Sequence, residues 1–536
     1  MNRPSIHAWL LLPVLVIAVG VRLWGLGFGL PHPMTRPDEE FLISVALRFF
    51  AGDFNPHFFE WPSLYFYVVH AALRGAYVMG AYPDSAAFVA AVSRDPGWVH
   101  LMLRSMSVIA GIGTIAVVYR LARRLFNADA ALAAAAFLAV AYLHVRDSHF
   151  GVLDVPLTLA IVGTVALVAR ACRDEQAVRW FALAGLAAGL ATSIKYNAGV
   201  LIVPAIAAAA IRLRDGTPVE RGRTMAATAL FVVAFAGGFV AGTPYAILDP
   251  IAFREGLSAQ VTRLTEGHGI RIEQVWLRHL TFSLFHGVGW PVLVTGTIGS
   301  VWLALTDWRR AAIVMSFPLV YFAVIGGGHT AFIRYVTPLV PFICIGAAWA
   351  VDRVLRALLP PPWTARARAF AMMGIVLLLT LPSMLSVVRF DRMLTRTDTR
   401  VLAAAWLRGE IQPGQSLYES GASYARPHFA WTGPVVVLET EFDERRSTFV
   451  TAAGQPIAPD WVVLAESPLR LYTPVPAALR GILSARYEKV REFSPSREPE
   501  PESIFDRQDA FFLPFADFEA RERPGPALSI YRLSTR

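Results

Sequence analysis

Long apolar runs, separated by short polar connections, fill the first 390 residues of this chain. Several runs approach or exceed the ~20 residues that a helix needs to cross a bilayer. The pattern therefore predicts an all-α, polytopic membrane domain over residues 1–390, with about eleven transmembrane helices. The predicted spans are residues 8–28, 99–119, 129–145, 153–170, 180–194, 196–211, 225–247, 287–306, 311–326, 335–352 and 369–389.

The connections between these spans alternate between Arg-rich and Arg-poor. Arg clusters occupy residues 120–128, 170–179, 212–223, 309–310 and 353–368. The opposite connections carry one basic residue each, Arg146, Lys195 and Arg334. Because cytoplasmic loops carry the excess of basic residues, we predict that the Arg-rich loops are cytoplasmic. The segments predicted outside are residues 27–98, 248–286 and 390–536.

The fifth and sixth spans are short, since about 32 residues separate the Arg-rich loops that flank them. Two crossings then have ~16 residues and ~24 Å each, less than a ~30 Å hydrocarbon core. The turn "TSIKYN", residues 192–197, is expected below the outer surface, inside protein or beside a watery cavity. A single tilted span is the alternative, and it would give ten crossings and a cytoplasmic C-terminus.

The two ends of the chain differ from its middle. Residues 1–21 also have features of a signal peptide, and either reading leaves residues 30 onward on the same side. After Asp391 the long apolar runs stop, "DTRVLAAAWLRGEI" has helical spacing, and "PVVVLET", "DWVVLAES" and "LSIYRL" are short β-branched runs. We therefore predict a small, soluble, extracytoplasmic α/β domain over residues 391–536.

Composition supports the membrane interpretation and excludes other classes. Apolar residues make up 55% of the chain and the mean hydropathy is +0.47. The net charge of +9 comes mostly from Arg in the short loops, so it does not indicate nucleic-acid binding. The two cysteines, Cys172 and Cys344, lie in or beside spans and imply no disulfide framework. Lys occurs only at positions 195 and 489.

The stretch "RPDEE", residues 36–40, follows the first span. Pro37 suits the first turn of a helix, and Phe41, Val45 and Phe49 then form an apolar stripe at helical spacing. We predict an amphipathic helix on the outer membrane surface, with Asp38 and Glu39 in its first turn. The helix dipole would help to keep these carboxylates ionised there. The alternative is that they are ordinary acidic residues at a helix start.

Several motifs occur in an order that resembles a known family. An acidic pair after the first span precedes "GDFNPH" and "EWPSLYFY", and later come "RDSHFGVLDVPLTL", "GLATSIKYNAGVLIVP", "GTPYAILDP" and "FIRYVTPLVP". This order resembles the GT-C glycosyltransferases that use phospholipid-carried sugars, in particular protein O-mannosyltransferases and lipid A aminoarabinose transferases. The similarity extends to "DTRVLAAAWL" and "RPGPALSIYRL" and so covers nearly the whole chain.

The resemblance implies an inverting transfer of a hexose or pentose from a polyprenyl-phosphate donor to a lipid, glycan or protein acceptor. It implies a multi-pass protein of the inner (cell) membrane, with its site on the periplasmic or extracellular side. Asp38 would be the general base and Glu39 its neighbour in the acidic pair. The chemistry agrees, because an attacking hydroxyl needs a base, whereas a leaving phosphate needs positive charge rather than an acid.

Three basic residues are candidates to hold the donor phosphate. Lys195, followed by Tyr196, is the strongest, and its alternative is a Lys that snorkels at a helix end. Arg334 begins the tenth span at the same side. Arg36 either contacts the substrate or pairs with Asp38. The family's aminoarabinose branch has a Lys after the Glu of "EWPSL", but Trp61 stands there, which weakens the aminoarabinose interpretation.

The remaining candidates are acids and histidines on the outer side. By resemblance Asp154 is the second acid of the site, although "LDVP" also suits an ordinary helix N-cap. Glu60, Asp154 and His149 are possible ligands of a divalent metal, and no cofactor is certain. His268 is a candidate for acceptor or sugar contact. The rival interpretations are a secondary transporter, which would place charges at mid-span, and a non-catalytic lipid-handling protein or scaffold.

Overall fold

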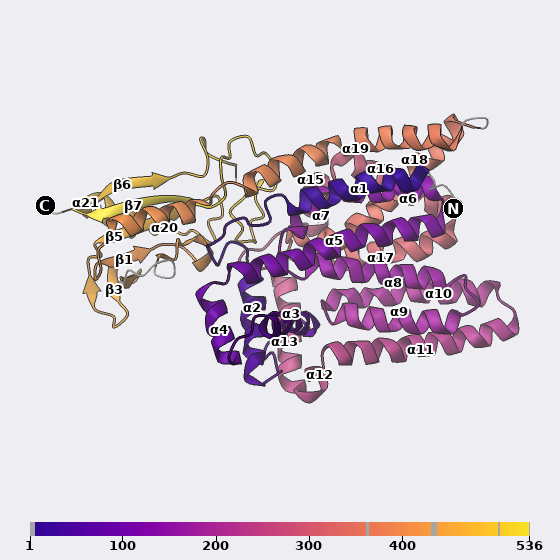
Figure 1. The fold of residues 1–536 in the computed structure, drawn as a ribbon, viewed down its shortest axis with the longest axis horizontal. Coiled ribbons are helices and arrows are strands. Elements are labelled where there is room, and N and C mark those ends of the chain that lie inside the picture. Colours follow the sequence, from indigo (N-terminus) through magenta and orange to yellow (C-terminus); the bar gives the residue numbers. More distant parts are fainter. Residues whose placement is uncertain (1–5, 361–363, 430–436, 502–503, 535–536) are drawn as a thin grey trace. The chain divides into compact units, whose positions relative to one another are not determined.

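The computed structural model describes residues 6–360, 364–429, 437–501 and 504–534 (Figure 1). The chain forms two compact units. The first comprises Met1–Leu23, Leu42–Arg94 and Met102–Val388, and the second comprises Trp24–Phe41, Asp95–Leu101 and Arg389–Arg536. The predicted boundary at residue 390 lies next to the last division, but the second unit also includes the segment that carries "RPDEE".

The first unit is helical, as predicted. Its longer helices, some of which extend into the second unit, are α1 (Ile6–Leu23), α3 (Leu64–Met79), α5 (Gly97–Leu125), α6 (Ala128–Ala139), α8 (Asp154–Ala171), α9 (Ala177–Thr192), α10 (Ile202–Asp215), α11 (Pro218–Gly242), α13 (Pro250–Glu266), α16 (Trp290–Thr306), α17 (Trp308–Gly326), α18 (Val340–Leu358) and α19 (Ala365–Leu394). Within the described ranges, seven helices are long and apolar enough to cross a membrane, or up to nine if each bent pair counts as one span. The multi-pass prediction is confirmed, whereas the number eleven stays a prediction.

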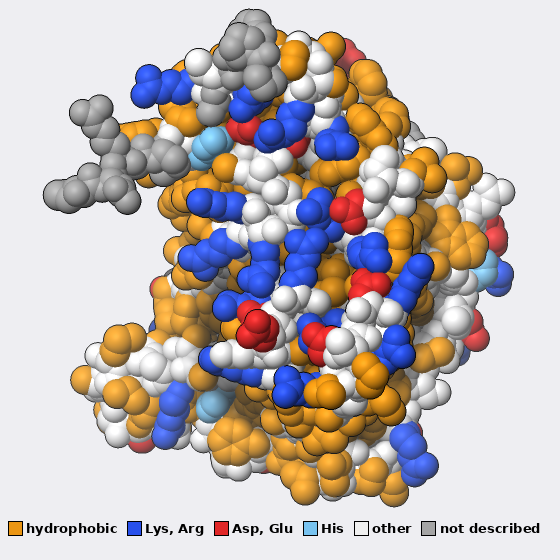
Figure 2. Space-filling view, turned by 90° about the vertical axis from the view of Figure 1, so that its right-hand side faces the viewer, with side chains coloured by type: hydrophobic (Ala, Val, Ile, Leu, Met, Phe, Trp, Pro, Cys, Tyr) orange, Lys and Arg blue, Asp and Glu red, His pale blue; other side chains and the backbone are white. Residues whose placement is uncertain are grey.

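The Arg-rich loops meet at one end of the first unit. Arg309 pairs with Asp215 at 3.0 Å, and Arg212 donates to the carbonyl of Ala171 at 3.2 Å. Arg356 reaches Asp129 at 3.2 Å. These contacts join the loops that follow α5, α8, α10, α16 and α18, and Figure 2 shows Lys and Arg side chains gathered on this face. The prediction that these loops share one side is confirmed.

The "TSIKYN" segment is the turn between two separate helices, α9 and α10, with a 3₁₀ segment at Tyr196–Leu201 (Figure 1). Helix α9 packs closely on α11. Gly189 allows this approach, since a Cβ at that position would lie only 2.1 Å from the carbonyl oxygen of Phe235. Small residues of this kind allow helix backbones to approach each other within membranes. The alternative of one continuous tilted span is therefore wrong.

Two pairs of helices bend sharply, one within a predicted span and one at the start of another. The predicted span 129–145 bends by 58° between α6 and α7 (Tyr142–Ser148). Arg22 of α1 is buried at this break and donates to the carbonyl of Ala139 at 2.9 Å and to Ala18 at 3.0 Å. The carbonyls that the bend opens are thus satisfied by a side chain from another helix. No Pro or Gly in "AVAYLH" announces the break.

The second bent pair of helices lies at the start of the predicted span 287–306. Residues Val275–Val288, which contain α14 (Val275–Arg278), a π-helical turn at His279–Leu284 and α15 (Phe285–Val288), meet α16 at 112°. Gly289, at φ 80°, makes the corner, and this backbone conformation favours glycine. The predicted outer segment 248–286 is accordingly helical over much of its length, with α12 (Tyr245–Leu248) and α13 at its start.

The second unit contains the predicted α/β domain. Its sheet has the order β4-β3-β2-β1-β5-β7-β6. The strands are β1 (Ser416–Glu419), β2 (Leu438–Asp443), β3 (Thr448–Thr451), β4 (Pro456–Ile457), β5 (Trp461–Glu466), β6 (Tyr487–Phe493) and β7 (Ala527–Leu533). β1 is parallel to β2 and β5, and the other pairs are antiparallel. "DWVVLAES" and "LSIYRL" form β5 and β7, whereas part of "PVVVLET" lies outside the described residues.

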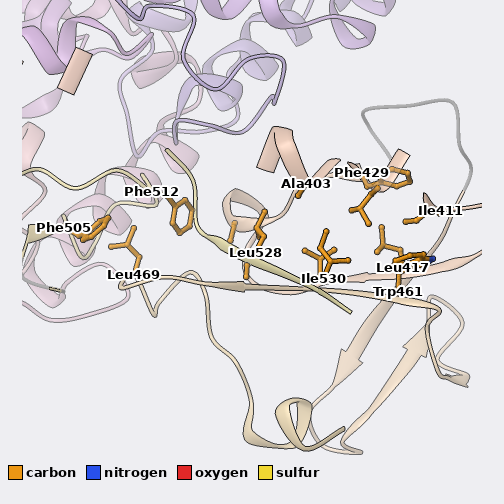
Figure 3. Close-up of a cluster of buried hydrophobic side chains, with 14 of the residues drawn as sticks. Ala403, Ile411, Leu417, Phe429, Trp461, Leu469, Phe505, Phe512, Leu528 and Ile530 are labelled. Atoms are coloured by element: carbon orange, nitrogen blue, oxygen red, sulfur yellow. The ribbon is translucent and has the colours of Figure 1, made fainter. Parts of the chain in front are cut away.

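Both faces of β5 are buried, which explains its continuous apolar run. Trp461, Val463 and Ile530 form one core with α20 (Thr399–Glu410), as Figure 3 shows. Val462 and Leu464 pack on the other face with Leu479 and Leu483 of α21 (Ala477–Arg486). Helices therefore cover the central strand from both sides.

A topology test follows from the Arg-rich end, because α19 begins there. Alkaline phosphatase fused after residue 400 of a truncated chain is expected to be active, since the Arg bias puts the end of α19 outside. The same enzyme fused after residue 215, in an Arg-rich loop, is expected to be inactive. Activity of only the second fusion would contradict the predicted orientation.

Candidate functional site

Three of the predicted residues converge in the first unit. Lys195 donates from its Nζ to Oδ1 of Asp154 at 2.8 Å, and Nε of Arg334 lies 4.0 Å from Oδ2 of the same carboxylate. The side chains are only 14%, 11% and 4% exposed for Lys195, Arg334 and Asp154. One carboxylate thus lies between two basic side chains.

Three different elements place these side chains. Asp154 is the first residue of α8, where the helix dipole favours an acid; the N-cap is Leu153, so the N-cap alternative for Asp154 is wrong. Lys195 lies in the turn between α9 and α10, where its backbone is extended. Arg334 lies in the 3₁₀ helix Ile333–Leu339, beside Tyr335, whose ring centroid is 4.6 Å from Nζ of Lys195. Lys195 therefore points into the protein and does not snorkel.

A cavity of about 220 Å³ adjoins Lys195. Its polar lining comes from Glu60, Tyr196, Asn197 and Gln260, and Trp61 and Tyr335 add aromatic rings. Its apolar wall comes from α13 and α17 and consists of Leu257, Val261, Leu264, Val324 and Ile325. The cavity thus joins one buried ammonium group to a largely apolar surface, an arrangement that suits a phosphate attached to an organic group.

The loop that carries "EWPSL" is fastened around this cavity. Tyr196 donates from its hydroxyl to the carbonyl of Phe59 at 2.8 Å, and Glu60 pairs with Arg263 of α13 at 2.5 Å. Asn55 donates to Asp249 at 3.0 Å. Trp61 stacks on Phe66, with 6.2 Å between the ring centroids and 15° between the planes. Tyr196 therefore holds the loop in place in addition to lining the cavity.

The possible metal ligands are not brought together. Glu60 pairs with Arg263, Asp154 pairs with Lys195, and the buried Nδ1 of His149 lies 3.0 Å from the carbonyl of Val145. Across the part of the chain that the structure describes, no group of three or more His, Cys, Asp or Glu side chains is placed to hold a metal ion. The geometry therefore does not fit a metal bound by Glu60, Asp154 and His149.

A second buried charge pair, which the sequence analysis did not single out, lies in "RDSHF". Nη1 of Arg146 donates to Asp147 at 2.8 Å, and Thr337 donates to the other carboxylate oxygen at 2.5 Å. Thr337 lies in the same 3₁₀ helix as Arg334. The sequence held a signal for this pair, because Asp147 directly follows Arg146, the one basic residue of its loop. The sequence analysis used Arg146 only to predict topology.

His268 lies in the connection between α13 and α14. Its ring centroid is 5.2 Å from that of Phe332, two residues before Arg334. It stays a candidate for substrate contact.

The acidic segment belongs to the second unit. Asp38 has a φ of 78°, in the left-handed region, and α2 (Glu39–Arg48) begins at the next residue. The prediction that Pro37 and Asp38 lie in the first helical turn is therefore wrong by two residues, while Glu39 does begin the helix. A non-glycine residue at positive φ is uncommon, although Asp and Asn tolerate it best, and such residues cluster at functional sites.

Residues of the C-terminal domain surround this segment. Arg36 forms a buried ion pair with Asp509, 473 positions away, at 2.7 Å. Arg400 donates to the carbonyl of Met34 at 3.2 Å, and Glu40 accepts a hydrogen bond from the hydroxyl of Tyr424. Arg36 is thus an anchor for the segment.

Glu40 has an unusual ionisation equilibrium. Burial raises the pKa of its carboxyl from 4.5 to about 7. The hydrogen bond from Tyr424 lowers this pKa, and the charges of Asp38 and Glu39 raise it. Glu40 is therefore partly protonated at neutral pH.

Glu40→Gln should change how stability depends on pH. The folded state holds the proton of Glu40 more tightly than the unfolded state, so this group destabilises the protein as pH rises from about 4.5 to 7. The substitution should therefore raise stability relative to the wild type by about 2 kcal/mol more at pH 7.5 than at pH 4.5. Thermal unfolding at both pH values measures it, with Glu410→Gln, at an exposed position, as the control. Equal shifts in the two variants would contradict the expectation.

Comparisons with known proteins bear on the family and the fold. Residues 85–237 match the family described as dolichyl-phosphate-mannose-protein mannosyltransferase. A comparison with curated protein sequences finds no match.

Solved structures extend the likeness beyond these residues. The chain is similar to ArnT from Cupriavidus metallidurans bound to undecaprenyl phosphate, with 14% identity, 99% of each chain covered and a TM-score of 0.55. It is also similar to the Archaeoglobus fulgidus oligosaccharyltransferase in complex with Zn and sulfate, with 12% identity, 91% of this chain and 72% of that chain covered, and a TM-score of 0.50. The chain spans 58% of the archaeal oligosaccharyltransferase AglB from the same organism, at 14% identity, 76% coverage of this chain and a TM-score of 0.48.

Proposed function

Because this chain has the fold of the GT-C glycosyltransferases, we propose that it moves a sugar from a polyprenyl-phosphate donor to an acceptor on the outer face of the cell membrane. The acceptor class is a hydroxyl-bearing lipid, glycan or protein. The apolar helices keep the protein in the bilayer that also holds the carrier.

The observation that carries this proposal is the cluster of Lys195, Asp154 and Arg334 beside the cavity. A leaving phosphate needs positive charge placed in advance where its own charge develops. Lys195 and Arg334 place two positively charged side chains beside the cavity for that purpose. Their burial strengthens the interaction, because little water competes for the phosphate oxygens.

Asp38 is proposed as the general base. It takes the proton of the acceptor hydroxyl while the acceptor oxygen forms a bond to the anomeric carbon. The bond between that carbon and the phosphate oxygen breaks, and the phosphate leaves on the carrier. Attack opposite the leaving group inverts the anomeric centre. Glu39 is buried and begins α2, and it supports the acidic segment.

Trp61 bears on the identity of the donor. It lines the cavity at the position where the aminoarabinose branch has a Lys. The donor phosphate then takes its charge from Lys195 and Arg334. This arrangement favours a donor sugar other than aminoarabinose. The flat indole ring of Trp61 supplies a stacking surface for that sugar.

The function is tested with purified full-length protein and a panel of polyprenyl-phosphate hexoses and pentoses. Release of carrier phosphate is measured in the presence of a lipid extract that supplies acceptors. We expect turnover of at least one donor by the wild type and loss of that turnover in Asp38→Asn. Equal release by both proteins, or no release from any donor, would contradict the proposal.

A further inference from the structure

A second cavity, of about 440 Å³, lies in the second unit where α19 ends. Its lining is strongly basic and comes from three parts of the chain, residues 389–396, Arg497 and residues 518–523. The residues are Arg389, Arg392, Met393, Arg396, Arg497, Phe518, Glu519, Arg521, Glu522 and Arg523. The function proposed above does not use this cavity.

Only part of its positive charge is balanced. Arg389 pairs with Glu519 at 2.6 Å, and the buried Arg521 pairs with Glu500 at 2.7 Å. Glu522 pairs with Arg497. Three arginines of the lining remain, and among the described residues none of them has an acid within ion-pairing distance. They are Arg392, Arg396 and Arg523.

Two of these arginines, Arg396 and Arg523, act on the same region of the cavity. The pKa of Glu522 is lowered first by its hydrogen bond with Arg497 and then by the charges of Arg523 and Arg396. Arg392 and Arg396 are exposed, so their guanidinium groups are accessible to a ligand. Guanidinium groups bind phosphate by paired, charge-assisted hydrogen bonds.

Helix α19 indicates where such a ligand comes from. Leu381, Leu385 and Val388 are 49%, 49% and 47% exposed, which marks the side of the helix that faces lipid. Their spacing of three and four residues places them on one face, and Arg392 follows four residues after Val388 on that face. The exposed apolar side of α19 therefore ends at the basic cavity, which Arg392 lines.

The usual explanation for Arg at a helix end does not apply here. The orientation signal of α19 lies at its other end, in its first turn, which contains Arg366 and Arg368. Arginines that only anchored the helix would not need to line a cavity that also contains the ion-paired acids Glu519 and Glu522. We propose that this cavity binds the phosphate headgroup of an anionic membrane lipid. The inference does not rest on the proposed sugar transfer.

The test compares two charge-matched variants of the full-length protein. Arg392→Gln/Arg396→Gln removes two arginines of the cavity, and Arg408→Gln/Arg445→Gln removes two exposed arginines elsewhere in the second unit. Each protein is placed in phosphatidylcholine nanodiscs that contain a trace of phosphatidylglycerol. Lipids that remain bound after gentle release are counted by native mass spectrometry, and thermal unfolding confirms that both variants fold.

We expect the wild type and the control variant to retain phosphatidylglycerol in preference to phosphatidylcholine. Each Arg near an anionic lipid contributes about 1 kcal/mol, so loss of two should weaken retention about 30-fold. Equal retention by the two variants would overturn the proposal. In a second arm, inorganic phosphate competes with the lipid in detergent. If inorganic phosphate displaces phosphatidylglycerol when both are at equal concentration, the cavity is a site for soluble phosphate, and the lipid assignment is overturned.

Discussion

Asp38→Asn is expected to lower turnover by ~10²-fold or more, which is the usual contribution of a general base. The substitution is well matched to this position, because Asn tolerates the φ of 78° about as well as Asp does. It keeps the shape and removes the charge, so the melting temperature should change little. Steady-state kinetics with the active donor, together with thermal unfolding, measure both quantities.

Glu40→Gln is the control for this prediction. Glu40 lies two residues away and is already partly neutral because its pKa is raised to about 7. It should lose much less activity. Near-normal transfer by Asp38→Asn would show that the acidic segment is only a helix start.

Lys195→Met is expected to weaken donor binding by about 10²-fold, because it removes a buried charge that would bind the phosphate. It also leaves Asp154 without its 2.8 Å partner, so part of the effect could come from the damaged cluster. Isothermal titration measures the affinity for the donor, and thermal unfolding measures the loss of stability that comes from the damaged cluster. Lys195→Arg need not rescue binding, since a planar guanidinium does not replace a compact ammonium group.

A double variant decides between the two roles of Lys195. Lys195→Met/Asp154→Asn removes both charges and leaves no buried carboxylate without its partner. If Lys195 only neutralises Asp154, the double variant should recover stability and donor binding together. If Lys195 holds the phosphate, stability should recover and donor binding should not. Recovery of both would contradict our assignment.

Local patterns made much of the fold predictable. Apolar runs located the helices, the Arg asymmetry placed the loops at one end, and the β-branched runs located β5 and β7. The turn at Lys195 followed from simple arithmetic on span length. Each of these features depends on neighbouring residues in the sequence.

Long-range contacts explain most of what could not be predicted. The break between α6 and α7 depends on Arg22, whose partner Ala139 is 117 residues away. The pairing of Lys195 with Asp154 joins positions 41 residues apart, and both were candidates without any sign that they meet. The start of α2 differs from the prediction, and the residues on either side of Asp38 contact the C-terminal domain through Arg36–Asp509 and Glu40–Tyr424.

The membership of residues Trp24–Phe41 in the second unit has a consequence for biosynthesis. The acidic segment leaves the ribosome long before its anchor Asp509, which lies 473 positions after Arg36. At ~5–20 residues per second, on the order of half a minute or more separates the two. During that interval the membrane helices insert while Asp38 lacks its final support. The proposed transfer activity should therefore appear only after Asp509 has been made, and a product truncated before this residue should lack it.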